Sequence, residues 1–167
     1  TILQRRGKFA EAVNAYSRAL RINPNLGMLY GRFADALRSV GRFEDAIEAG
    51  KRAVQVDPKS AETQLGLGLA CQATGHNEEA IAAYRQAIVF KPSLLEAYTN
   101  LGVLLQRTGR CEEAIDVYKS ALTIDPKCEF ALTNLASILK EQGCLTEAAD
   151  TYRRLSTAGA NHVSPST

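Results

Sequence analysis

Hydrophobic residues along the chain recur with the spacing of amphipathic helices, and glycine and proline interrupt them at regular intervals. Between Leu95 and Pro126, two sets of apolar side chains repeat every three or four residues, which places each set on one face of a helix. Gly109 separates the two sets, and the second ends at Pro126, because proline cannot continue a helix. This segment therefore predicts two helices joined by a turn at the glycine.

The same pattern recurs with a period of 34 residues. Three residue types each form a series with this step: Pro24, Pro58, Pro92 and Pro126; Gly7, Gly41, Gly75, Gly109 and Gly143; Ala12, Ala46, Ala80, Ala114 and Ala148. A tyrosine series, Tyr16, Tyr84, Tyr118 and Tyr152, runs in step with them and is interrupted at Gly50. Internal repeats of this length indicate stacked helix pairs.

The interruption at Gly50 predicts a local weak point. Glycine in a helix interior costs about 1 kcal/mol relative to alanine, and a missing aromatic ring leaves volume unfilled. We therefore expect Gly50→Tyr to raise the melting temperature, unless neighbouring residues already occupy the space.

The order of small residue, turn glycine, alanine, aromatic residue, alanine and closing proline resembles the tetratricopeptide repeat, from Thr1 to about Thr157. The resemblance implies an all-α fold, a right-handed α-solenoid of stacked antiparallel helix pairs. The expected organisation is a partial repeat at 1–26, full repeats at 27–60, 61–94 and 95–128, an incomplete last repeat at 129–157, and a flexible polar tail at 158–167. On this division the chain opens inside a helix, as a fragment of a longer array would.

Composition narrows the class of protein. The 20 Lys and Arg residues and 18 Asp and Glu residues nearly cancel, so nucleic acid is not an expected partner. No apolar stretch has the length of a membrane span, and the first residues lack the apolar segment of a secretory signal. The four cysteines form no Cys-x-x-Cys pair and have no histidine at metal-ligand spacing. We expect an intracellular protein, cytoplasmic or nuclear, with reduced thiols and no metal.

Nothing in the sequence has the pattern of a catalytic site. Gly66-Leu67-Gly68 lies within a predicted helix, whereas a nucleotide-binding glycine motif lies in a strand-to-helix turn. His76 follows the turn glycine Gly75, where an exposed helix-entry residue is the simpler interpretation. The chain is therefore predicted not to be an enzyme and to have no catalytic residue and no cofactor.

In tetratricopeptide-repeat proteins the first helix of each pair lines the concave face, so the resemblance implies that ligand contacts lie there. The residues expected to bind a peptide in this groove are Arg32, Asp35, Leu69, Gln72, Thr99, Asn100, Val103, Gln106, Arg107, Phe130, Thr133, Asn134, Ser137 and Lys140.

Asn100 and Asn134 are equivalent positions, each in a Thr-Asn-Leu triplet, and resemble the asparagine ladder of the O-GlcNAc transferase solenoid. An asparagine amide has both a donor and an acceptor for a peptide backbone. In the alternative interpretation, these amides bond their own helix or a neighbouring loop.

The leading hypothesis is a protein-protein interaction scaffold that binds a peptide or partner segment in its groove. Capture of a carboxylate-terminated tail is disfavoured, because only Asn100 matches the asparagine and basic residues that co-chaperones of this family use. Two alternatives remain open. The chain could be the substrate-recognition arm of a larger enzyme, such as a glycosyltransferase similar to O-GlcNAc transferase, or a structural scaffold that self-associates through uncapped solenoid ends.

Overall fold

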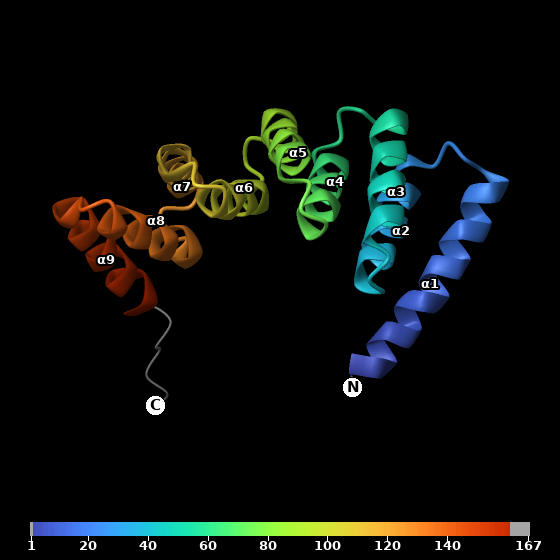
Figure 1. The fold of residues 1–167 in the computed structure, drawn as a ribbon, viewed down its shortest axis with the longest axis horizontal. Coiled ribbons are helices and arrows are strands. Elements are labelled where there is room, and N and C mark those ends of the chain that lie inside the picture. Colours follow the sequence, from blue (N-terminus) through green and yellow to red (C-terminus); the bar gives the residue numbers. More distant parts are fainter. Residues whose placement is uncertain (1, 161–167) are drawn as a thin grey trace. The chain divides into compact units, whose positions relative to one another are not determined.

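A computed structural model of the protein describes residues 2–160, with side chains for residues 7–157. This part of the chain forms nine α-helices and no strand (Figure 1). The helices are α1 (Ile2–Ile22), α2 (Gly27–Ser39), α3 (Phe43–Val56), α4 (Ala61–Ala73), α5 (Asn77–Phe90), α6 (Leu95–Arg107), α7 (Cys111–Ile124), α8 (Glu129–Glu141) and α9 (Leu145–Ala160). The predicted all-α fold is confirmed. None of the described helices is both long and apolar enough to cross a membrane.

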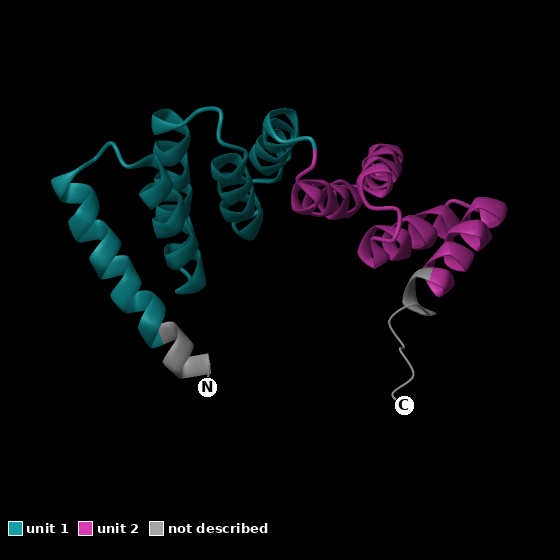
Figure 2. Cartoon of the chain, turned by 180° about the vertical axis from the view of Figure 1, so that it is seen from behind, with its two compact units in different colours: residues 1–92 teal, residues 93–167 magenta. Residues whose placement is uncertain are grey.

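The chain divides into two compact units, Thr1–Pro92 and Ser93–Thr167 (Figure 2). In the first unit α1 packs on α2, α2 pairs with α3, and α4 pairs with α5, while α4 also contacts α2 and α3. In the second unit α6 pairs with α7 and α8 with α9, and α8 also contacts α6 and α7. Each unit therefore places its first helices beside one another, α2 with α4 and α6 with α8.

The turns within the helix pairs have a common backbone geometry. Gly41, Gly75, Gly109 and Gly143 have φ between +78° and +86°, which glycine adopts without steric cost. After each glycine, the next backbone N–H bonds a carbonyl five residues back, as from Arg42 to Leu37 at 2.9 Å. These are Schellman motifs, which satisfy carbonyls that the end of the first helix leaves free.

Gly7 does not form the turn that its place in the glycine series predicts. It lies inside α1, which continues from Ile2 to Ile22, and its φ is not positive. The glycine spacing alone therefore does not determine a turn at this position.

Buried tyrosines and glycines form matched pairs in the core. The rings of Tyr84 and Tyr118 are 0% exposed, and each lies over a glycine of the preceding first helix, Gly68 or Gly102. A Cβ atom at either glycine would lie 2.5 Å from Cε1 of its tyrosine. In the repeat register, the other two repeats have alanine at the position of the glycine, Ala34 and Ala136, and have Gly50 and the 43% exposed Tyr152 at the position of the tyrosine. Glycine thus occurs only where a tyrosine ring is fully buried.

The unfilled volume predicted at Gly50 is not present. A Cβ atom at this buried glycine would lie 3.1 Å from Cδ1 and 3.3 Å from Cα of Leu67, so α4 already occupies the space that an aromatic ring would need. The missing side chain permits a close approach of α3 and α4 and leaves no unfilled volume.

The last helix extends past the predicted end of the repeats. α9 includes residues 158–160, which the sequence assigned to the flexible tail. The rest of the predicted tail, 161–167, lies outside the described residues.

Candidate protein-binding surface

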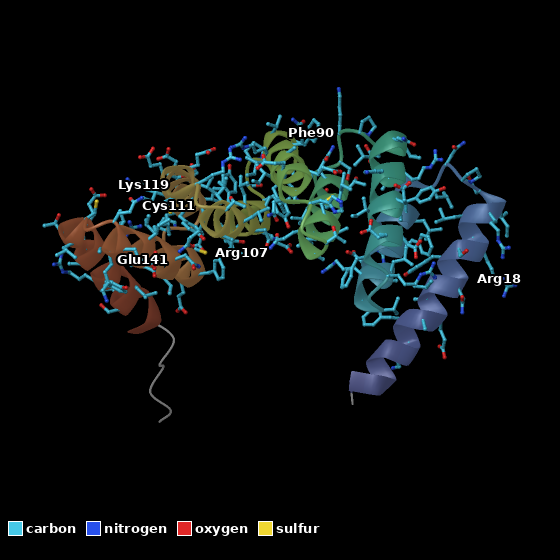
Figure 3. The ribbon with its side chains drawn as sticks, viewed as in Figure 1. Arg18, Phe90, Arg107, Cys111, Lys119 and Glu141 are labelled. Carbon is cyan, nitrogen blue, oxygen red and sulfur yellow. The ribbon has the colours of Figure 1, made fainter. Side chains whose placement is uncertain are left out.

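All the residues predicted to contact a ligand lie on first helices. Arg32 and Asp35 are on α2, and Leu69 and Gln72 on α4. The α6 group is Thr99, Asn100, Val103, Gln106 and Arg107, and the α8 group is Phe130, Thr133, Asn134, Ser137 and Lys140. Every one of these side chains is half-buried or exposed. We call the surfaces that carry them the first-helix faces. They are distinct from the second helices of the same pairs, as Arg107 on α6 and Lys119 on α7 illustrate (Figure 3).

A cleft of about 520 Å³ opens between α2 and α4 in the first unit. Its lining residues are Gly27, Met28, Gly31, Arg32, Asp35, Asp57, Ser60, Glu62, Thr63 and Gly66. A Cβ atom built at Gly31 or Gly66 would have no neighbour within 4 Å, so the missing side chains at these two positions leave the cleft open. We call it the glycine cleft.

The rim of the glycine cleft carries charges of both signs. Asp35 pairs with Arg38 at 3.2 Å, and Glu62 pairs with Lys91 at 2.7 Å. The hydrogen bond from Lys91 lowers the pKa of the Glu62 carboxyl below its ordinary value. Arg32 and Asp57 also line the cleft, and neither side chain makes an ion pair or hydrogen bond with any residue that the structure describes. Two opposite charges are therefore available to a ligand.

Gln72 and Gln106 occupy equivalent positions but have different surroundings. The hydroxyl of Tyr84 donates a hydrogen bond of 2.6 Å to Oε1 of Gln72, which fixes that side chain and leaves its NH₂ group for a ligand. The corresponding hydroxyl of Tyr118 is buried and has no partner among the described residues. Burial raises the pKa of Tyr118 to about 12. Gln106 therefore keeps both its donor and its acceptor.

The two predicted ladder asparagines also differ. The Nδ2 group of Asn134 donates to the backbone oxygen of Phe130 at 2.8 Å, within its own helix. Asn134 therefore follows the alternative interpretation, in which the amide bonds its own helix. Nearby, Thr133 donates to the Glu129 carbonyl at 2.7 Å. The amide of Asn100 makes no hydrogen bond with the described residues, so of the two asparagines it has the more available side chain.

Large apolar side chains stand beside these polar groups. On the first-helix faces Met28 is 80% exposed and Phe130 is 50% exposed. Aromatic residues and methionine are enriched in protein-protein interfaces, where they supply contact area.

The structure offers little that suggests chemistry. Among the described residues, no group of three His, Cys, Asp or Glu side chains could hold a metal ion. Cys71 is fully buried, and burial raises the pKa of its thiol to about 11, with a smaller effect from Glu79. A thiol in such surroundings behaves as a core residue. His76 lies just before α5, with Nδ1 2.6 Å from the Thr74 hydroxyl.

Comparison with known proteins identifies the family. A TPR repeat model matches residues 34–75 and 71–109, and a tetratricopeptide repeat model matches residues 1–26 and 95–128. The chain belongs to the tetratricopeptide-repeat (TPR) superfamily. A comparison with curated proteins gives no match.

Solved TPR structures resemble the chain over nearly its whole length. A crystal structure of MamA aligns with a TM-score of 0.88 and 26% identity, over 95% of this chain and 92% of MamA. MamA from Desulfovibrio magneticus RS-1, residues 41 to the end, gives 0.84 and 17%, over 96% and 91%. YrrB, described as a TPR protein with an unusual peptide-binding site, gives 0.76 and 21%, over 90% and 77%. The chain thus has the fold of a protein-interaction scaffold.

The glycine cleft is the part of this TPR surface that sequence reasoning missed. Arg32 and Asp35 were predicted, but Asp57, Ser60 and Thr63 were not. The alignment of the repeats contained a signal for this cleft. Glycine stands at Gly31 and Gly66, where the corresponding positions of α6 and α8 have threonine and asparagine, respectively.

Proposed function

We propose that this TPR protein is a non-enzymatic scaffold that holds a segment of a partner protein, extended or helical, on its first-helix faces. The observation that supports this most is the state of the polar side chains there. The side chains of Asn100 and Arg32 have no partners among the described residues. Arg32 lies on α2, which also exposes Met28, and Asn100 lies on α6, which contacts α8 with its exposed Phe130. Unused hydrogen-bonding groups beside apolar surface are what a peptide ligand requires.

The second helices differ in this respect, because many of their charged side chains pair with one another. Lys51 of α3 lies 3.6 Å from Glu79 of α5 in the first unit, and Lys119 of α7 lies 3.8 Å from Glu147 of α9 in the second. Arg110, just before α7, donates to Glu113 at 2.7 Å. More of the ion pairs in the described part of the chain lie on second helices than on first helices, which favours the first helices as the binding side.

The test uses a peptide selected by display on the intact purified chain, labelled with fluorescein and titrated by anisotropy. In the groove variant, Asn100→Ala is combined with Gln106→Ala, so that two groups with free hydrogen-bonding capacity are removed from α6. Each net hydrogen bond contributes about 1 kcal/mol, so binding should weaken roughly tenfold to a hundredfold.

A matched control carries Asp116→Ala and Ser120→Ala, two exposed positions of α7. It should bind as the unmodified protein does. If the control loses as much affinity as the groove variant, or the groove variant loses none, the ligand does not use the first-helix face of α6.

A further inference from the structure

We propose that the glycine cleft between α2 and α4 receives a long basic side chain, arginine or lysine, from the bound partner segment. This inference rests on the proposed function and names the side chain that one part of the surface selects. Three independent features of the cleft support it: its shape, a threonine hydroxyl that no described residue bonds, and the charges of its rim.

The shape is specific to the first unit. The facing residues of the cleft are Gly31 on α2 and Gly66 on α4, and neither would bring a Cβ atom within 4 Å of another residue. At the equivalent positions of the second unit, Thr99 on α6 and Asn134 on α8 carry side chains. The missing side chains leave a space of about 520 Å³, which is large enough for a long side chain and part of its backbone. Met28 lines the same space and is 80% exposed, so its thioether chain can cover the methylene stem of a lysine or arginine.

The hydroxyl of Thr63 lies in this cleft without a partner. Thr63 is only 8% exposed and lines the cleft. Its backbone N–H bonds Oγ of Ser60 at 3.2 Å, but its side chain makes no hydrogen bond with any described residue. The equivalent residues of the second unit are Ala97 and Ala131, both fully buried. The cleft therefore presents a hydroxyl where the second unit has alanine, and this hydroxyl can bond the polar end of a ligand.

The rim favours a positive ligand over a negative one. Its charged residues are the carboxylates Asp35, Asp57 and Glu62 and the guanidinium of Arg32. The Asp35 and Glu62 ion pairs are exposed, and such pairs are weak enough to share a carboxylate with an incoming cation. The Asp57 carboxylate is unpaired among the described residues. A guanidinium has five donors, which suit carboxylates and a threonine oxygen together, whereas an acidic side chain would meet three carboxylates and a single guanidinium among the lining residues.

The probe is Nα-acetyl-arginine N-methylamide, titrated into the ¹⁵N-labelled chain and followed by NMR. The neutral citrulline analogue, which has nearly the same shape, and the glutamate analogue are titrated in parallel. We expect the backbone amides of Gly31, Thr63 and Gly66 to shift with the arginine amide, at concentrations about tenfold lower than with the citrulline analogue, because hydrogen bonds between ionised groups are the stronger ones. Equal responses to arginine and citrulline, a stronger response to glutamate, or arginine shifts that avoid these three amides would each overturn the proposal.

A second experiment uses a variant in which the cleft is closed by residue types that the second unit has at the equivalent positions. Gly31→Thr combined with Gly66→Asn introduces the side chains that the second unit has at the equivalent positions. The unfolding midpoint should be unchanged or higher, since both sites have open space and helix interiors disfavour glycine. The Thr63 shift with the arginine amide should disappear, and in the open-cleft variant Asp57→Asn it should require about tenfold more probe.

The same closed variant separates this inference from the proposed function. If a display-selected peptide binds it as tightly as it binds the unmodified chain, while Asn100→Ala with Gln106→Ala weakens binding, the cleft assignment fails and the proposed function stands. If neither variant changes peptide binding, the proposed function fails, and the arginine titration still decides whether the cleft accepts a basic side chain.

Discussion

Replacing Gly68 by alanine should destabilise the protein, although alanine is the better helix former. The new Cβ atom would lie 2.5 Å from Cε1 and 2.6 Å from Cδ1 of Tyr84. That ring is 0% exposed, and its hydroxyl is held by Gln72 at 2.6 Å, so it has little freedom to move away. Overpacking of this kind costs about 1–3 kcal/mol, and the gain in helix propensity is about 1 kcal/mol.

Gly66→Ala, two residues earlier on the same helix, is the matched comparison. It gains the same helix propensity, but its Cβ atom meets nothing within 4 Å. It should therefore stabilise the protein by about 0.5–1 kcal/mol. The difference between the two variants isolates the packing cost, about 1–3 kcal/mol, and can be measured by urea unfolding followed by far-ultraviolet circular dichroism.

A double-mutant cycle completes the test. With Tyr84→Leu in the background, Gly68→Ala should lose its penalty and resemble Gly66→Ala, because the ring that it displaces is gone. If Gly68→Ala is as stable as Gly66→Ala in the unmodified protein, the pairing of buried tyrosine with glycine does not explain the small residues of this core.

Four further outcomes follow from the packing. Gly50→Tyr should lower the melting temperature, because α4 occupies the space at this position. Tyr84→Phe should cost about 1 kcal/mol by losing its bond to Gln72, whereas Tyr118→Phe should be neutral or stabilising, because its hydroxyl has no partner among the described residues. The raised pKa of Tyr118, about 12, means that the unfolded chain releases this proton first, so stability should fall from about pH 10 to pH 12, and less steeply in Tyr118→Phe. Iodoacetamide should label the exposed Cys144 at neutral pH and leave Cys71, which is buried and has a pKa raised to about 11, unmodified in the folded protein.

The helix pairs and four of their turns could be predicted because local chemistry determines them. Helical spacing, a glycine at positive φ and a proline after the second helix recur in each repeat, and the structure has helices and turns at those places. Gly7 belongs to the same series but lies inside α1, so the spacing of the glycines is not sufficient to predict a turn.

The details of the binding surface depend on pairs of residues from different helices. The sequence predicts unfilled volume at Gly50, whereas in the structure Leu67 of the next helix lies against this glycine. The glycine cleft requires two absent side chains on α2 and α4 at once, and neither glycine indicates it alone. Whether an asparagine bonds its own helix, as Asn134 does, or remains available, as Asn100 does, is a choice between side-chain conformations that the Thr-Asn-Leu triplet does not distinguish.

The most direct test of the account is an NMR map of the intact ¹⁵N-labelled chain with a display-selected peptide bound. We expect the largest amide shifts on the first helices α2, α4, α6 and α8. Shifts that are largest on α3, α5, α7 and α9 would contradict this expectation, because the partner would then bind the second helices and not the first-helix faces.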